Sequence, residues 1–279
     1  MREALRYSSN VFFESVIGGT RDVRNLGENE KIDGLDETGE KLAEMARGYG
    51  FGSPTGIPLP GEARGTVPSK SWKAGLDTPL GREPWSTGDT YNFAIGQGNL
   101  LVTPLQLAVA SAAVANGGTL YRPQLVKAFT DATGQVVREI GPEVSRQAPV
   151  APEHLRVIRE GMRLSVTSGF NSCARADLSG LEIAGKTGTA EYPEVIDPTK
   201  VEYDPENIRI RSHAWFAGFA PYDDPEIEVV VLVEGAGDLN DGSATLAVPA
   251  VTEIMQAYFG AVPAPESFAP VPPYNLPCH

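Results

Sequence analysis

Lys186, Thr187, Gly188 and Thr189 are the residues of this sequence whose types and spacing are best suited to chemistry. They follow a short apolar run in the stretch "LEIAGKTGTAEY", which predicts a half-buried strand. Gly188 allows close approach to the backbone, while the lysine supplies a positive charge and the threonines supply hydroxyl donors. This combination is typical of a strand edge that binds a carboxylate. The four residues alone fit equally well the end of a surface strand with a solvated lysine.

A second polar cluster, Ser8-Ser9-Asn10, interrupts the N-terminal stretch "REALRYSSNVFFESVIGG". The pattern predicts one helix before the cluster and a second helix after it, which ends at Gly18-Gly19. By itself the cluster has an ordinary explanation, in which Ser9 or Asn10 caps the second helix.

The first two thirds of the chain read mainly as helices and loops. Residues 20–40 are polar and acidic, which predicts an exposed loop, and "EKLAEMARGYGFG" predicts a helix. The Pro- and Gly-rich stretch 53–89 predicts an extended loop with short strands. Thr103-Pro104 is a typical helix start. The stretch "APEHLRVIREGMRLSVTS" predicts an amphipathic helix whose apolar face contains Leu155, Ile158, Met162 and Ser165.

Strand patterns dominate after Leu181. The stretch "HAWFAGFAPYDDPEIEVVVLVEG" predicts a hairpin with "DDPE" at its turn. The polar segment between Tyr192 and Ser212 predicts a long connection, functional or disordered. A final helix over "ATLAVPAVTEIMQAYFG" precedes a Pro-rich tail at 263–279. Helices first and antiparallel strands later predict an α+β fold, with an antiparallel sheet flanked by helices.

Composition excludes several classes of function. The net charge of −13 argues against nucleic acid as the main partner. Cys173 and Cys278 form neither a disulfide framework nor a zinc-ligand pattern, so we expect no metal and no cofactor. Three histidines without a Gly-x-Ser-x-Gly motif argue against a Ser-His-Asp triad. The most apolar stretch, "LLVTPLQLAVASAAVANGG", is interrupted by proline, glutamine and asparagine, so no membrane span is predicted.

The order of the motifs resembles a known family. "YSSNVFFE", "TGIPLPGEARGTVPSKSWK", "GDTYNFAIGQGNLLVTPLQLA", "AGKTGTAE" and "HAWFAGFAP" resemble the transpeptidase domain of class B penicillin-binding proteins. "GDTYN", "IGQG" and "VTPLQLA" resemble the cell-elongation type most. The resemblance covers Tyr7 to Gly260. It implies the fold shared with serine β-lactamases, with residues 1–262 as the C-terminal portion of a transpeptidase domain and 263–279 as a tail.

The family has three motifs: Ser-x-x-Lys with the nucleophile, Ser-x-Asn, and Lys-Thr-Gly. On this sequence Ser8 and Asn10 match the second motif, and Lys186 to Gly188 match the third. The resemblance implies that Ser8 relays protons near the leaving amine and that Asn10 holds the side-chain amide of the acyl donor.

The resemblance also implies roles on the strand. Lys186, Thr187 and Gly188 would form the binding site for the terminal carboxylate of a D-Ala-D-Ala stem peptide. Thr189 would give its backbone N–H to the oxyanion hole and its hydroxyl to the carboxylate. Ser8, Asn10, Lys186 and Thr189 are thus the expected catalytic residues, and Thr187, Gly188 and Thr189 the expected substrate-binding ones.

The sequence departs from the family at the first motif. None of its seven lysines has a serine three residues before it, so Ser-x-x-Lys is absent. The nearest mimic, Thr38 to Lys41, lies after the second motif, which is the wrong order. We therefore expect the nucleophile and the general-base lysine to lie outside this chain, the N-terminal part of the fold to be missing, and the chain alone to be inactive.

The resemblance implies stem peptides, β-lactams and a membrane glycan polymerase of the elongation machinery as partners. It also implies an extracytoplasmic location, with the parent protein anchored by an N-terminal membrane helix. Two alternatives stay open: a relative without a nucleophile that binds peptide or protein without turnover, and a β-lactam hydrolase or sensor of the same fold.

Further residues have two interpretations each. Tyr91, Asn92 and Gln97 either line the cleft or belong to a turn packed on the core. His213 either approaches the cleft or is structural, and we favour the structural role. Trp72 and Trp85 are expected to anchor loops.

Overall fold

The computed structural model describes residues 1–19, 34–36, 38–168, 180–197, 199, 205–237 and 242–260. The helices in these parts are α1 (Arg2–Arg6), α2 (Asn10–Gly18), α3 (Glu40–Gly48), α4 (Lys70–Ala74), α5 (Pro79–Arg82), α6 (Thr87–Ala94), α7 (Pro104–Ala115), α8 (Pro152–Thr167) and α9 (Val248–Tyr258). The strands are β1 (Thr119–Tyr121), β2 (Ala128–Thr130), β3 (Val136–Glu139), β4 (Val144–Gln147), β5 (Ala184–Val195), β6 (Ile208–Ala220) and β7 (Ile227–Gly237). A π-helical turn (Ser243–Ala247) leads into α9. The predicted α+β organisation is confirmed.

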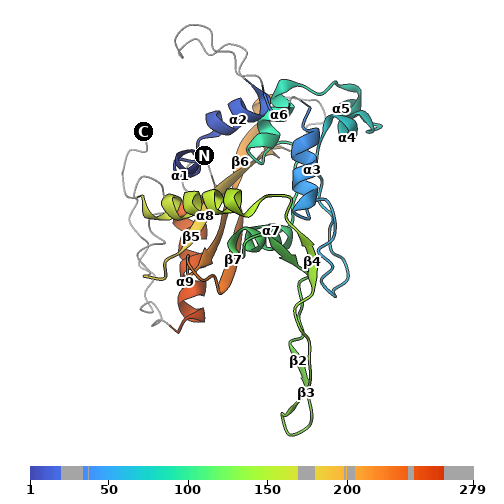
Figure 1. Cartoon of the computed structure of the whole chain (residues 1–279). Coiled ribbons are helices and arrows are strands. Elements are labelled where there is room, and N and C mark those ends of the chain that lie inside the picture. The colour runs from blue at the N-terminus through green and yellow to red at the C-terminus, as the bar shows by residue number, and fades with distance from the viewer. Residues whose placement is uncertain are drawn as a thin grey trace.

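The long strands β5, β6 and β7 form one antiparallel sheet in that order, with α8 crossing in front of it in Figure 1. Phe216 of β6 packs with residues of α9 on one face of the sheet. Phe219 of the same strand packs with residues of α7 and α8 on the other face. The three-residue separation of these side chains places them on opposite faces of a strand. Helices therefore cover the sheet on both sides.

Helices α7 and α8 begin where the sequence predicts. Thr103 and Gln106 form a capping box at the start of α7, since each side chain accepts a hydrogen bond from the backbone N–H of the other. Pro152 occupies the first turn of α8. The predicted apolar face of α8 is buried or half-buried: Leu155, Ile158, Met162 and Ser165.

The prediction of an extended loop with short strands at 53–89 is partly wrong. The second half of this stretch contains α4, α5 and the start of α6 instead of short strands. The hydroxyls of Ser69, Thr78 and Ser86 each accept a hydrogen bond from a backbone N–H in the turn that follows. These caps stabilise short helices between the prolines and glycines, and the composition alone does not reveal them.

The prediction of a long connection between Tyr192 and Ser212 also needs correction. The connection is shorter than predicted, because β5 continues to Val195 and β6 already begins at Ile208. Pro193 lies within β5, opposite Ile210. A proline is tolerated there because β5 is an outer strand of this sheet among the described residues, and its missing N–H falls on the outward edge.

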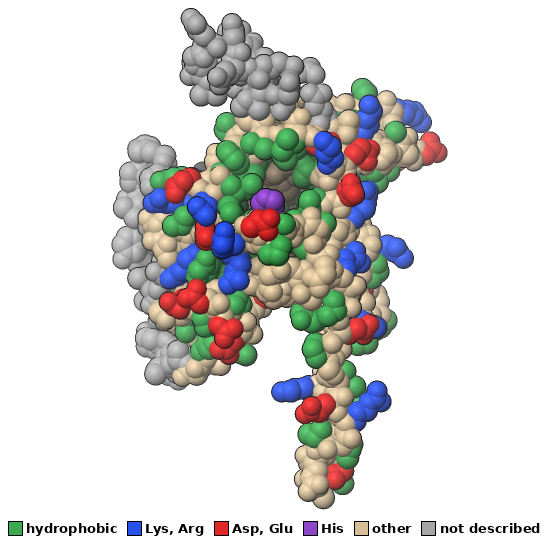
Figure 2. Space-filling model, viewed as in Figure 1, with side chains coloured by type: hydrophobic (Ala, Val, Ile, Leu, Met, Phe, Trp, Pro, Cys, Tyr) green, Lys and Arg blue, Asp and Glu red, His purple; other side chains and the backbone are tan. Residues whose placement is uncertain are grey.

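Strands β2 and β3 form a hairpin that projects from the body of the molecule (Figure 1). Figure 2 shows hydrophobic and charged side chains interspersed along it. Phe129, Val136 and Val137 are exposed there. The hairpin contains none of the predicted site residues.

Several predictions lie outside the described residues: most of the loop 20–40, both cysteines and the tail 263–279. In the part of the chain that the structure describes, no helix combines the length and the apolar character needed to cross a membrane.

Candidate active site

Lys186 and Ser8 meet in space although 178 residues separate them in the chain. The Lys186 Nζ donates to Ser8 Oγ at 2.7 Å and to the carbonyl oxygen of Thr187 at 3.0 Å. Lys186 lies opposite Ala217 and therefore on the face of the sheet that α7 and α8 cover. The two polar clusters singled out in the sequence thus form one site.

Helix α8 positions both halves of this site. Gly161 of α8 faces Leu5 of α1, and a Cβ at Gly161 would lie 2.6 Å from Leu5 Cδ1. Glycine therefore lets α1, which ends next to Ser8, pack closely on α8. Arg163 of the same helix donates to the carbonyl of Ile183 at 2.8 Å, just before β5.

Ser8 adopts a left-handed backbone conformation, with φ of 52°. It follows the last residues of α1, where Ser8 N–H bonds to Leu5 O at 3.2 Å and Ser9 N–H bonds to Ala4 O at 2.9 Å. These two bonds define a Schellman motif, in which glycine usually occupies the left-handed position. A serine in this conformation is strained, and such strain tends to persist at functional sites.

The other two residues of the cluster have separate roles. The Ser9 hydroxyl caps α2 by accepting from the Phe12 N–H at 3.3 Å. Asn10 is the exposed first residue of α2, two positions after Ser8. Ser9 therefore satisfies the helix terminus, while Ser8 contacts Lys186.

Ser243 is a site residue that the sequence analysis missed. It is buried in the π-helical turn, and its hydroxyl donates to the carbonyl of Gly188 at 2.7 Å. Its Oγ also lies 3.4 Å from Thr189 Oγ1. Ser243 therefore fixes the backbone between Lys186 and Thr189. The only sequence signal is a Gly-Ser pair before the last apolar helix, which is too common to single it out.

Gly188 is needed for packing within the sheet. It lies opposite Trp215, and a Cβ at Gly188 would be 3.3 Å from Trp215 Cβ. The absent side chain therefore leaves room for the tryptophan as well as for a ligand near the backbone.

Gln97 contacts the outward edge of β5. Its Nε2 donates to Thr189 O at 2.7 Å, and its Oε1 accepts from Glu191 N–H at 3.1 Å. Asn92 lies in the last turn of α6, and its carbonyl accepts from Gln97 N–H in the following turn at 2.8 Å. Tyr91 donates its hydroxyl to Gly19 O at 2.7 Å. The packed-turn interpretation is therefore confirmed, since the turn holds Gln97 against the strand, and a role in lining the cleft stays a prediction.

His213 lies further along the sheet and has structural contacts. Its ring stacks on Tyr192 with centroids 4.3 Å apart, and its Nδ1 accepts from Gly235 N–H at 3.1 Å. These contacts to β5 and β7 agree with the structural role that the sequence favours.

A buried ion pair supports α6. Lys73 is 4% exposed and lies 3.0 Å from Asp89 at the start of this helix. Burial acts to raise the pKa of Asp89, but hydrogen bonds from Ser86 and Lys73 outweigh it, so this pKa is below its usual value. Trp85 donates its ring N–H to Thr90 Oγ1 at 2.8 Å, and it anchors the loop before α6 as predicted.

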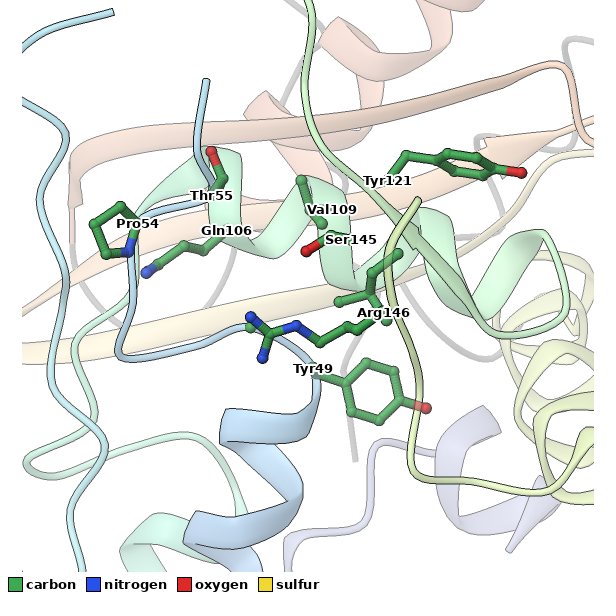
Figure 3. Close-up of a pocket in the computed structure, with 10 residues that line it drawn as sticks. Tyr49, Pro54, Thr55, Gln106, Val109, Tyr121, Ser145 and Arg146 are labelled. Atoms are coloured by element: carbon green, nitrogen blue, oxygen red, sulfur yellow. The ribbon is translucent and has the colours of Figure 1, made fainter. Parts of the chain in front are cut away.

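A small pocket lies away from this site, between the end of α3, α7 and the strands β1 and β4 (Figure 3). Figure 3 shows Gln106, Tyr49 and Arg146 among its lining residues. Gln106 has a structural role, because its Nε2 donates to the carbonyls of Ser53 and Arg64, each at 2.8 Å. Since the pocket contains none of the predicted site residues, we place the candidate site at Lys186 and Ser8.

Comparisons with known proteins show the family of this chain. Residues 1–256 match the family model described as the penicillin binding protein transpeptidase domain. The peptidoglycan D,D-transpeptidase MrdA of Haemophilus influenzae is 30% identical over 242 residues, which are 85% of this chain and 35% of that protein. MrdA of Acinetobacter baumannii is 34% identical over 210 residues, or 75% of this chain and 30% of that protein. The chain thus spans about a third of the length of these relatives.

Solved structures of penicillin-binding proteins have a similar fold. Penicillin-binding protein PBP2 from Helicobacter pylori is 27% identical, with a TM-score of 0.64 over 94% of this chain and 40% of that one. The same protein has been solved in complex with MreC, with 26% identity and a TM-score of 0.63, again over 94% of this chain and 40% of that one. The family match, the fold and the meeting of the Ser-x-Asn and Lys-Thr-Gly motifs lead to one conclusion: the chain belongs to the transpeptidase domain family of class B penicillin-binding proteins, of the PBP2 or MrdA type.

Proposed function

We propose that this chain supplies the substrate-recognition part of the active site of a peptidoglycan D,D-transpeptidase. In that reaction a serine oxygen attacks the carbonyl carbon of the penultimate D-Ala of a stem peptide. The terminal D-Ala leaves as an amine that takes up a proton, and an amine of a second stem peptide then displaces the serine. Family membership and the MrdA relatives support this reaction class. Because the chain spans about a third of those relatives, the activity proposed is that of a protein that contains it.

The hydrogen bond between Lys186 and Ser8 is the observation that carries the proposal. An ammonium group can only donate, so Ser8 Oγ is the acceptor and its own proton points elsewhere. A hydroxyl held in this way is suited to pass a proton to a leaving amine. The lysine charge beside it is suited to the carboxylate at the end of the peptide.

Thr189 is suited to stabilise the oxyanion. Its carbonyl bonds to Gln97 on the edge of β5 that faces away from β6. In an antiparallel ladder the N–H and C=O of one residue point to the same side, so the Thr189 N–H faces this outward edge. One such donor is typically worth about 3 kcal/mol of transition-state stabilisation.

The nucleophile is proposed to come from outside this sequence, because no Ser-x-x-Lys occurs within it. Asn10 is proposed to hold the side-chain amide of the acyl donor, since it is exposed and two positions from Ser8. Thr187 is proposed to assist Lys186 in carboxylate binding.

We further propose β-lactams as ligands, an extracytoplasmic location for the parent protein, and a membrane glycan polymerase as its partner. The solved complex of the H. pylori protein with MreC supports assembly with other proteins in general.

Covalent labelling with a fluorescent penicillin tests the proposal. We expect the full-length protein that contains this chain to be labelled and the 279-residue chain alone not to be. Lys186→Gln should slow labelling of the full-length protein by about a hundredfold, by analogy with loss of a transition-state donor. Lys127→Gln, on the projecting hairpin, is the matched control and should leave the rate unchanged.

Three outcomes contradict the proposal. An unlabelled full-length protein would indicate a relative that binds without turnover. Rapid release of the label as hydrolysed penicillin would indicate a hydrolase. Equal rates for Lys186→Gln and Lys127→Gln would remove Lys186 from the site.

A further inference from the structure

The side-chain amide of Gln97 engages the outward edge of β5 with both of its ends. It donates to Thr189 O at 2.7 Å and accepts from Glu191 N–H at 3.1 Å. Thr189 and Glu191 are alternate residues of the strand, so their main-chain groups point to the same side. The amide therefore takes the positions that the N–H and C=O of an added strand would occupy.

Two glycines aim Gln97 at this edge. Gly96 has φ of 78° and Gly98 has φ of 73°, in the left-handed region that favours glycine. A Cβ at Gly98 would also lie 3.1 Å from Asn92 Cβ. The bond from Gln97 N–H to Asn92 O at 2.8 Å closes the turn at the end of α6. The Gly-Gln-Gly sequence is thus a built turn that presents one side chain.

Helix α6 gives this turn a rigid base. The buried Lys73–Asp89 pair fixes its first turn, and the Tyr91 hydroxyl ties it to Gly19. Because α6 is anchored by these two contacts, the turn that follows it holds the Gln97 amide in a fixed position against β5.

The outward edge of β5 is therefore divided at Thr189. Before this point, the N–H groups of Thr187 and Thr189 share the outward side, next to Lys186 and Ser8. Beyond this point, Gln97 takes the Thr189 carbonyl and the Glu191 N–H. An extended ligand can pair with the first part of the edge and is blocked from the second.

We propose that Gln97 is a positioning residue that ends the peptide-binding edge of β5 and holds the Thr189 N–H in place. This inference rests on the proposed function. The ligand class is an extended peptide with a terminal carboxylate, whose backbone pairs with β5 only as far as Thr189. Gln97 acts through Thr189 and does not itself touch the reacting atoms.

The test uses Gln97→Ala in the full-length protein, with Gln124→Ala as the matched control. Gln124 also bonds a backbone carbonyl, that of Gly141 at 3.0 Å, but on the projecting hairpin. Stopped-flow acylation by a fluorescent penicillin separates the noncovalent dissociation constant from the first-order acylation rate. We expect Gln97→Ala to lower the first-order rate about tenfold or more, with little change in the dissociation constant, because a misplaced donor costs transition-state stabilisation.

Gln97→Glu adds a pH signature that a merely structural role would not produce. A protonated carboxyl keeps one donor and one acceptor, so it can remake both bonds, whereas a carboxylate cannot donate to Thr189 O. The acylation rate of Gln97→Glu relative to wild type should therefore rise as the pH falls toward about 4.3, the ordinary pKa of glutamate. The same ratio for Gln97→Ala should stay flat.

Hydrogen exchange gives a readout that does not depend on activity. Peptides that contain Glu191 should exchange faster in Gln97→Ala than in Gln124→Ala. If the wild-type protein is not acylated, the proposed function fails, while faster exchange in Gln97→Ala would still support the strand contact. Acylated wild type with unchanged rate and exchange in Gln97→Ala would overturn this inference.

Discussion

At the scale of single residues, Ser8 combines a strained backbone with a hydrogen bond from Lys186. Its φ of 52° places it where a Schellman motif usually has glycine, and its hydroxyl accepts from Lys186 at 2.7 Å. A glycine would satisfy the turn more easily but would supply no hydroxyl. The side chain is therefore best explained by the site and not by the stability of the turn.

This gives a prediction with two variants. Ser8→Gly should be more stable than Ser8→Ala by about 1 kcal/mol, because only the alanine keeps the left-handed strain. Both variants lose the hydroxyl, so both should acylate more slowly than wild type by a similar factor. Urea unfolding and penicillin labelling measure the two effects. Equal stability of the two variants would show that the position is not strained.

At the scale of elements, β7 meets α7 through a buried acid. Both carboxylate oxygens of Glu228 are shielded from water, and no described group bonds them with good geometry. Burial raises the pKa of Glu228 to about 8, and the nearby Ser111 hydroxyl and Gly218 backbone lower it only in part. Glu228 is thus neutral in the folded protein at neutral pH and ionised in the unfolded chain.

The direction of the pH effect follows from this difference. Between about pH 4.5 and pH 8 the folded state binds one more proton than the unfolded state, so the free energy of unfolding falls as pH rises. Glu228→Gln removes the titration, and it should flatten this slope and stabilise the protein at pH 8. Denaturant unfolding at pH 5 and pH 8 measures it, with the exposed Glu226→Gln as control. A slope unchanged by Glu228→Gln would contradict the prediction.

The sequence predicts those elements that local chemistry determines. The helix break at Ser8, the strand with Lys186 and the caps of α7 are readable because residue type and spacing encode them. The roles of Ser243 and Gln97 are not readable, since each depends on how a turn docks on β5 from far away in the chain. The short helices before Asp89 are not predicted from the sequence. Their hydroxyl caps stabilise helical turns that the surrounding prolines and glycines disfavour.

At the scale of the whole molecule, the described chain leaves several large apolar side chains exposed. Figure 2 shows a hollow bordered by hydrophobic side chains on the face that carries α8. Val11 of α2 is 70% exposed and Leu35 is 60% exposed. Apolar side chains of this size stabilise a protein by roughly 1.5–3 kcal/mol each when they are fully buried.

We therefore expect the 279-residue chain to melt at a lower temperature than the full-length protein. The transition of the transpeptidase domain in the two proteins can be compared by calorimetry. Val11→Ser should lower the melting temperature of the full-length protein and leave that of the shorter chain nearly unchanged. Equal melting temperatures of the two proteins would contradict the view that residues outside this sequence complete the core.

The position of the penicillin adduct shows whether this chain contributes the nucleophile or only the recognition residues. The full-length protein is acylated, digested and mapped by mass spectrometry. We expect a single adduct, on a serine outside these 279 residues, that forms more slowly in Lys186→Gln. An adduct on a residue of this chain, Ser8 above all, would contradict it.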